Sequence, residues 1–196
     1  MTMNSSEKKL TQKDLMGIFW RSFRQDAVWN FERQQNLGSA YTMSRVVGKL
    51  YEDDKEKRAR ALQRHVDFMA ITPHLSTLLY GILAAMEEEN ANNSDFDESS
   101  ISAVRASLMG PIAGIGDSLL WGTLRIIAAG IAISFSQNGS ILGPLLFLLI
   151  INVPCMILRY VCLFKGYELG TSFFKKVLDS GIMDTVTYVA SAIGLM

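Results

Sequence analysis

The sequence predicts an all-α integral membrane protein in which amphipathic helices precede a glycine-rich, discontinuous or re-entrant helical element and transmembrane helices. No residue from Ile126 to Leu158 is charged, although the 196-residue chain carries 19 basic and 19 acidic side chains. Within this stretch, Ile141–Leu158 is an apolar run of 18 residues, close to the length that crosses the hydrocarbon core of a bilayer. The alternative is a very hydrophobic core helix of a soluble protein.

Composition narrows the classes of function. The formal net charge is zero, so the basic surface of a nucleic-acid-binding protein is absent. Residues 1–14 have no apolar segment behind their lysines, so we expect no signal peptide and insertion through internal segments. Cys155 and Cys162 lie seven residues apart in the apolar run, without a nearby histidine. They are typical of small hydrophobic residues and not of a disulfide or metal pair. We therefore expect no metal and no cofactor.

The first helix is expected to begin after Thr11. Asp14 follows three residues later as a weak capping box, and Leu10 and Leu15 have the spacing of a hydrophobic staple. Apolar residues then recur at helical spacing, at Ile18, Phe19 and Phe23 among others. This pattern indicates an amphipathic helix that lies at a membrane surface or packs on a partner helix. The segment alone is equally compatible with an ordinary soluble amphipathic helix.

The next segment, Trp29–Gly38, combines two aromatic residues with a dense set of polar ones. On a helix, Glu32, Gln35 and Asn36 would share one face, and Asn30, Arg33 and Gln34 another. Carboxylates and amides can pair with sugar hydroxyls while an aromatic ring covers the apolar side of a sugar. The segment is therefore a possible sugar-binding surface, and the competing interpretation is a solvated polar helix end.

Acidic residues 52–54 favour the start of another helix. The basic residues that follow predict a cytoplasmic position for this helix, because positive residues cluster on the cytoplasmic side of membrane proteins. They are Lys55, Lys57, Arg58, Arg60 and Arg64. His65 on this helix and His74 in the following turn are expected to be ordinary solvated residues. A further helix with a broad apolar face runs from Leu75 to Met86.

A polar linker, Asn90–Ser100, separates two predicted regions. Residues 1–100 form a helical region that is largely cytoplasmic or interfacial, and residues 101–196 form the membrane-embedded region. The second region contains a hairpin that turns at residues 137–139. Asn152 and Pro154 predict a kink with a polar point inside the membrane.

The stretch Ser107–Arg125 organises the second region. Four glycines and a proline interrupt it, at positions 110, 111, 114, 116 and 122, so we expect the backbone to break or bend. Its single acid, Asp117, is expected to be buried between Arg105 and Arg125. Ionisable groups at membrane depth are typical of functional sites, and broken backbone is tolerated there only beside protein or water. The alternative is a glycine-rich packing face on which Asp117 pairs with an arginine.

These motifs together resemble the IID membrane component of the mannose-type phosphotransferase sugar transport systems. The resemblance rests on WNFERQQNLG, RHVDFMAITPHL, LLYGILAAMEEE and above all LMGPIAGIGDSLLWGTLR. GSILGPLLFLLIINVP and YELG also fit, and the resemblance extends from Leu10 to Met196 in order.

The resemblance implies a multi-pass subunit of the bacterial cytoplasmic membrane that works with a IIC subunit to take a hexose across the bilayer. Soluble IIA and IIB proteins would relay phosphate from phosphoenolpyruvate, and IIB would phosphorylate the sugar. A IID protein is itself a transport subunit without catalytic residues or a phosphorylation site, and it assembles into a multimer of IIC–IID pairs. On this resemblance the expected sugar path contains seven residues, namely Trp29, Asn30, Glu32, Arg33, Gln35, Asp117 and Trp121.

Members of this family usually continue beyond the position of Met196 with another apolar span, and this chain stops at SAIGLM. The expectation that follows is a fragment, a frameshift product or a short variant. Its alternative function is that of a truncated, non-transporting paralogue that only binds IIC. A soluble enzyme is a poor third hypothesis, because no nucleophile–base or metal constellation occurs in the sequence.

Overall fold

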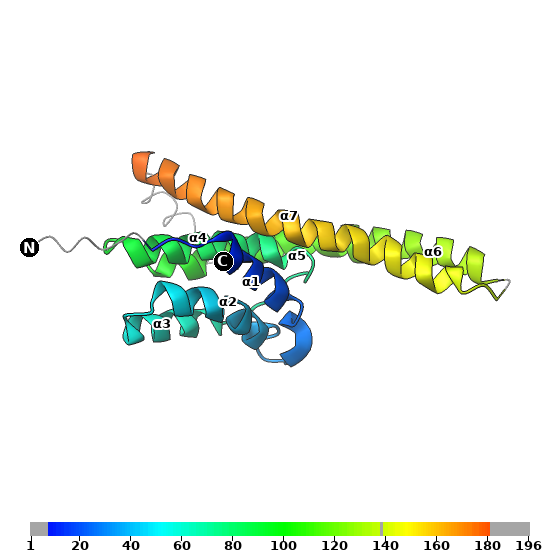
Figure 1. Ribbon diagram of the computed structural model, residues 1–196, viewed down its shortest axis with the longest axis horizontal. Coiled ribbons are helices and arrows are strands. Elements are labelled where there is room, and N and C mark those ends of the chain that lie inside the picture. The colour runs from blue at the N-terminus through cyan, green and yellow to red at the C-terminus, as the bar shows by residue number, and fades with distance from the viewer. Residues whose placement is uncertain (1–7, 138, 181–196) are drawn as a thin grey trace, which may run out of the picture.

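The computed structural model describes residues 8–137 and 139–180, of which 172–180 are described by their backbone alone. The described residues form helices and contain no strand, which confirms the all-α prediction. The elements are α1 (Gln12–Ser22), η1 (Gln25–Val28), α2 (Asn36–Leu50), α3 (Lys55–His65), α4 (Ser76–Asn92), α5 (Ser99–Gly116), η2 (Asp117–Leu124), α6 (Arg125–Ser136) and α7 (Leu142–Ser180). Helices α1 to α4 gather at one end, and a long hairpin of α6 and α7 extends beyond them (Figure 1).

Local capping chemistry starts the first and third helices. The Asp14 carboxylate accepts hydrogen bonds from the Thr11 amide at 2.8 Å and from its hydroxyl at 2.6 Å, so the predicted capping box is present. Asp54 caps α3 by accepting a hydrogen bond from the Lys57 amide at 2.9 Å. These contacts satisfy amide groups that have no partner within their own helix. The acidic residues before α3 therefore begin this helix, as predicted.

The apolar face of α1 packs inside the chain. Leu15, Ile18 and Phe19 are buried in the core that α1 shares with α2 and α4. Phe23, the fourth residue of the predicted stripe, is 44% exposed just beyond the helix. The sequence predicted that this helix lies at a membrane surface or packs on a partner helix, and the structure shows α1 packed on α2 and α4.

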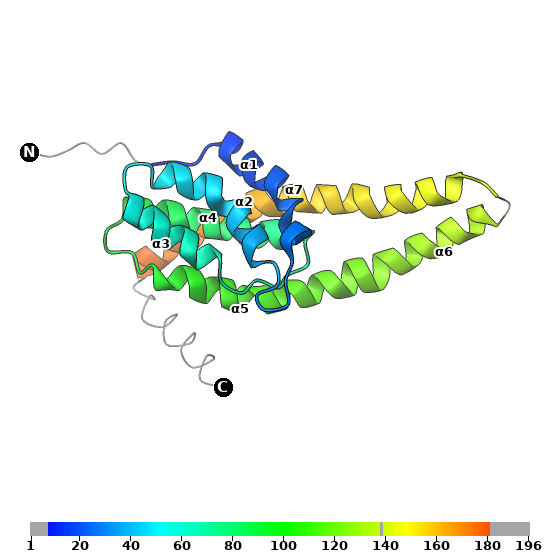
Figure 2. The same ribbon diagram turned by 90° about the horizontal axis from the view of Figure 1, so that it is seen from below.

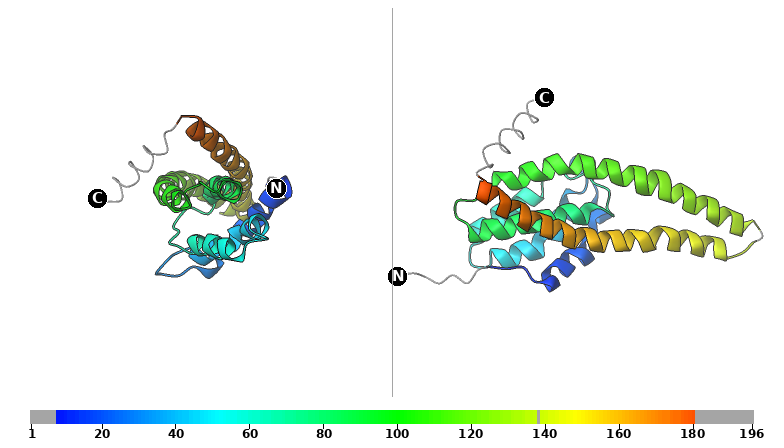
Figure 3. Two further views of the ribbon diagram at one scale, coloured as in Figure 1. Left: turned by 90° about the vertical axis from the view of Figure 1, so that its left-hand side faces the viewer. Right: turned by 90° about the horizontal axis from the view of Figure 1, so that it is seen from above.

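The helices lie in three layers. Helix α7 covers α4 and α5, which in turn cover α2 and α3 (Figure 3). Helix α4 is the centre of this arrangement, since Leu79, Tyr80 and Leu83 are fully buried. Glycines allow α4 and α7 to approach closely, because a side chain on Gly81 or Gly166 would collide with the carbonyl group of the other helix.

Two helices are long and apolar enough to cross a membrane. They are Ser99–Ser136, which comprises α5, η2 and α6, and Leu142–Thr171 within α7, and together they form the membrane hairpin. Only 17% and 11% of their most apolar windows are buried within the chain. The core helix of a soluble protein would be mostly buried, so this finding opposes the soluble alternative. The two arms meet at the turn after Ser136, where Gly139 has a φ of 71° (Figure 2). Gly139 can adopt this left-handed conformation because it has no Cβ.

The irregularity predicted for Ser107–Arg125 takes a milder form than a break. The backbone stays helical from Ser99 to Ser136, and Pro111 lies inside α5. The irregular part is η2, an eight-residue π-helical stretch from Asp117 to Leu124. Stretches of π-helix inside longer helices are frequent at functional sites. Helix α7 likewise continues through Pro154, and Asn152 donates a hydrogen bond to the Leu148 carbonyl at 2.7 Å.

Candidate functional site

The polar segment after Trp29 is a tight loop, so the helical faces predicted for its polar residues do not form before Asn36. The backbones of Asn30 and Gln34 pair through two hydrogen bonds of 3.1 and 3.0 Å. The Asn30 side chain accepts a hydrogen bond from the Arg33 amide at 2.8 Å, a turn contact that asparagine makes readily. Gln34 has a φ of 55°, which an α-helix excludes.

Gln35 fastens this loop to the rest of the chain. Its side chain is buried and donates hydrogen bonds to Asp26 at 2.7 Å and to the Ile71 carbonyl at 3.0 Å. It also accepts hydrogen bonds of 2.9 Å from Gln25 and from the Ile71 amide. Two donors and an acceptor oxygen are thus fully used by protein groups. Asn30 is held in a similar way, by a 2.8 Å hydrogen bond to Asn36.

Three other members of the predicted sugar path have free surface on the loop. Glu32 and Arg33 form a loose ion pair with a Nε–Oε1 separation of 3.8 Å, and the Glu32 side chain is 84% exposed. Trp29 packs edge to face against Phe31, with ring centroids 4.9 Å apart, and both rings are partly or largely exposed. The loop therefore presents a carboxylate, a guanidinium and an aromatic ring to its surroundings.

The segment from Met69 to His74 connects this loop to the membrane hairpin. The backbone N–H of Gln35 donates a hydrogen bond to the Met69 carbonyl at 2.8 Å. Three residues further on, the Thr72 hydroxyl lies 2.7 Å from the Asp117 carboxylate and 3.1 Å from the Ala113 carbonyl. Thr72 fits there because Gly116 has no side chain. The two groups of predicted path residues, far apart in sequence, thus meet at one connecting segment.

Asp117 lies at the surface of the chain, so the expectation that it is buried between two arginines is wrong. Arg105 pairs with Asp67 at 2.8 Å and also donates to the Arg64 carbonyl. Arg125 lies over the ring of Trp121, with its Cζ 5.1 Å from the ring centroid. Among residues 8–137 and 139–171, no cationic group lies within ion-pair distance of Asp117. The sequence spacing predicted that Arg105, Asp117 and Arg125 lie along one helical element. It could not predict that Arg105 would pair with Asp67 and Asp117 with Thr72.

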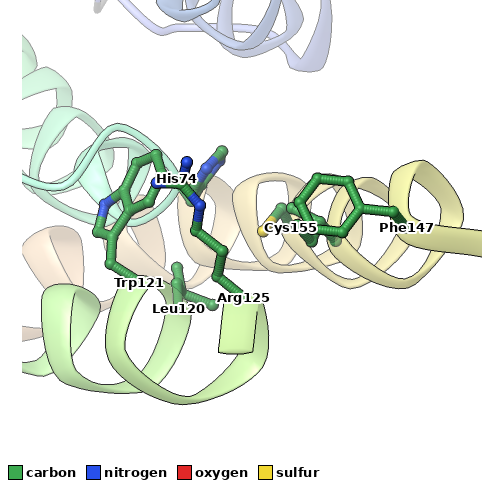
Figure 4. Close-up of a pocket in the computed structure, with 7 residues that line it drawn as sticks. His74, Leu120, Trp121, Arg125, Phe147 and Cys155 are labelled. Atoms are coloured by element: carbon green, nitrogen blue, oxygen red, sulfur yellow. The ribbon is translucent and has the colours of Figure 1, made fainter. Parts of the chain in front are cut away.

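A pocket of about 170 Å³ lies between η2 and the start of α6 on one side and α7 on the other (Figure 4). It is lined by His74, Leu120, Trp121, Arg125, Phe147, Ile151 and Cys155. The rings of His74 and Trp121 have their centroids 6.0 Å apart. Burial, and then the positive charge of Arg159, lower the pKa of His74 below its usual value of 6.5. Imidazole and indole thus form one wall of the pocket beside the Arg125 guanidinium.

Neither histidine is the ordinary solvated residue that the sequence predicted. His74 is half-buried at the pocket, and His65 is fully buried. The Nε2 of His65 lies 3.0 Å from the Glu87 carboxylate, which also binds Arg64 at 2.7 Å and Tyr51 at 2.7 Å. Sequence reasoning missed both positions because each depends on a residue more than 20 positions away.

Within the described residues, no three metal-ligating side chains lie together.

The profile of the PTS system mannose/fructose/sorbose family IID component matches residues 9–196. The mannose-specific EIID component of Escherichia coli K12 is 37% identical over 194 residues, 99% of this chain and 68% of that protein. The chain belongs to this IID family. The fructose permease IID component of Bacillus subtilis is 40% identical over 96% of this chain and 68% of its own length.

The fold of this IID chain also matches a solved structure. The match is to the cryo-EM structure of the mannose transporter ManYZ in complex with microcin E492, with a TM-score of 0.87 and 38% identity. It covers 96% of this chain and 69% of the other. The family assignment made from the motifs is thereby confirmed, and with it the interpretation of the hairpin as part of a phosphotransferase membrane component.

Proposed function

We propose that this IID chain works with a IIC subunit to carry a hexose across the bacterial cytoplasmic membrane, where a IIB protein phosphorylates it. The observation that carries the proposal is the family match over residues 9–196. In this proposal the chain is a multi-pass transport subunit in a multimer of IIC–IID pairs, and IIA supplies phosphate to IIB. The IID chain itself takes no part in phosphoryl transfer.

The arrangement of polar groups supports a role in sugar translocation. A carboxylate, amides and aromatic rings on the loop adjoin a membrane helix that carries another carboxylate and indole, through the contact of Thr72 with Asp117. Sugar hydroxyls both donate and accept hydrogen bonds, so a path for a sugar needs groups of both kinds. Exposed polar groups beside an apolar hairpin are unfavourable in lipid unless a partner or a passing solute contacts them.

The proposed path comprises all seven predicted residues, with different tasks. Glu32, Arg33 and Trp29 have free surface and would contact sugar or IIC. Asp117 and Trp121 would continue the path along the membrane helix. Gln35 and Asn30 would hold the loop in shape, because their side chains already bind protein groups.

A phosphorylation assay tests this proposal. Membranes that contain this chain and IIC, supplied with the soluble relay proteins and phosphoenolpyruvate, should convert a hexose to its phosphate. Replacing Glu32 by Ala should lower the rate at least several-fold, whereas Glu56→Ala, a change at an exposed acid on α3, should not.

Two results would contradict parts of the proposal. Unchanged phosphorylation by a chain carrying both Glu32→Ala and Asp117→Asn would remove the site assignment. Co-purification of IIC without hexose phosphorylation would instead favour the non-transporting alternative.

A further inference from the structure

Arg125 stands just before the charge-free stretch and has no counter-ion among the side chains that the structure describes. It is exposed, and its guanidinium contacts the face of Trp121. Among the side chains described in residues 8–137 and 139–171, no carboxylate lies within ion-pair distance of Arg125. Arg105, on the same long helix, differs in having Asp67 as its partner. A charged side chain on a membrane helix is costly and normally faces a partner or a water-filled cavity.

The depth of Arg125 argues against a lipid headgroup as that partner. Helix α6 runs from Arg125 to Ser136, so Arg125 lies roughly 17 Å from the hairpin turn at a rise of 1.5 Å per residue. The hydrocarbon core is about 30 Å thick. With the polar turn at one membrane surface, Arg125 lies near the middle of the core, and both headgroup layers are further away than its side chain extends.

The lining of the pocket argues against a neutral sugar as the main ligand of Arg125. Apolar side chains and Trp121 form most of the wall, and no carboxylate or amide side chain contributes to it. Arg125 can only donate hydrogen bonds, and it favours planar anions that accept two of them. The pocket, at about 170 Å³, is far larger than the 10–15 Å³ that one water requires, so a side chain can enter it.

We infer that the pocket beside Arg125 receives a carboxylate side chain from a membrane-spanning helix of the IIC subunit. This inference rests on the proposed function, because it names the surface through which IID holds IIC. The incoming acid neutralises Arg125, and the indole of Trp121 keeps the guanidinium in place on its other side. Such a pair fixes the register of the two subunits, since a shifted helix would leave both charges unpaired in lipid.

Co-purification tests the inference. The tagged chain and IIC are expressed together, extracted in a mild detergent, and the amount of IIC recovered per tagged chain is measured. Arg125→Gln should lower this ratio at least tenfold, whereas Arg125→Lys, which keeps the charge but not the planar fork, should retain more of it than Arg125→Gln. Arg58→Gln, a change on α3 outside both spans, is the matched control and should leave the ratio unchanged.

Exchanging the two charges distinguishes the loss of a specific ion pair from a general loss of folding. Arg125→Glu is combined in turn with replacement by Arg of each acidic residue in the IIC spans, and one combination should restore the complex. Unchanged IIC recovery with Arg125→Gln would overturn the inference while leaving the proposed function intact. Loss of the complex that no exchange and no lysine restores would also overturn it. If the unaltered chain fails to recover IIC, the proposed function fails as well.

Discussion

Gln35 and Glu32 lie three residues apart on the same loop and have opposite surroundings. The Gln35 side chain is buried, and it donates two hydrogen bonds and accepts two. The Glu32 side chain is largely exposed. Gln35→Ala leaves several buried groups unpaired and should destabilise the chain by about 3 kcal/mol. Glu32→Gln should change the unfolding free energy by less than about 0.5 kcal/mol while lowering hexose phosphorylation. Chemical unfolding in detergent measures the stability, and the phosphorylation assay measures the activity. A large stability loss in Glu32→Gln, with none in Gln35→Ala, would contradict this assignment of roles.

Glu87 makes the stability of the helical end depend on pH. Burial acts to raise its pKa, but its contacts with His65 and Arg64 outweigh this and lower the pKa from 4.5 to about 2. Because the folded-state pKa is the lower one, the stabilisation is complete above pH 4.5 and is lost as the pH falls towards 2. Glu87→Gln should therefore lose less stability than the unaltered chain between these pH values.

The measurement for Glu87 is the unfolding free energy at several pH values, with Glu56→Gln as the control because Glu56 is exposed. Equal pH dependence in the unaltered chain and Glu87→Gln would show that the buried ion pair does not stabilise the fold.

At the scale of the elements, the contact of α4 with α7 joins the helical end to the hairpin. A Cβ on Gly166 would collide with the Leu78 carbonyl, whereas one on Gly48 would meet no atom within 4 Å. Gly166→Ala should thus cost about 2 kcal/mol by pushing the helices apart. Gly48→Ala should instead stabilise α2 by about 0.5–1 kcal/mol, because alanine restricts the unfolded chain. Thermal unfolding measures the change in stability of Gly166→Ala and of Gly48→Ala. Equal changes in the two variants would refute close packing of α4 on α7.

The elements also show how far the sequence leads. Helical periodicity and capping residues predicted α1, α3 and α4 because these signals are local. The loop before Asn36 was missed because its shape depends on Gln35 binding Ile71, 36 residues away. The positions of His74 and Arg125 in the pocket were missed for the same reason, since only the folded chain brings the turn before α4 beside η2. Charge and composition predicted the membrane hairpin but not the contacts of its charged residues.

At the scale of the whole molecule, the hairpin should be embedded and the basic helix α3 should face the cytoplasm. With both native cysteines replaced by alanine, Lys55→Cys should react with a membrane-impermeant maleimide only from the cytoplasmic side. Leu149→Cys, 58% exposed in the chain alone, should stay unlabelled from both sides because lipid or IIC covers it. Labelling of Leu149→Cys in intact membranes would show that the hairpin is in water.

The whole account depends on this chain helping to move sugar through the bilayer. The most direct measurement is hexose uptake by sealed membrane vesicles that contain IIC with or without this chain, loaded with the relay proteins and phosphoenolpyruvate. The account predicts hexose phosphate inside vesicles only when both subunits are present. Equal accumulation with IIC alone, or none with both subunits assembled, would contradict it.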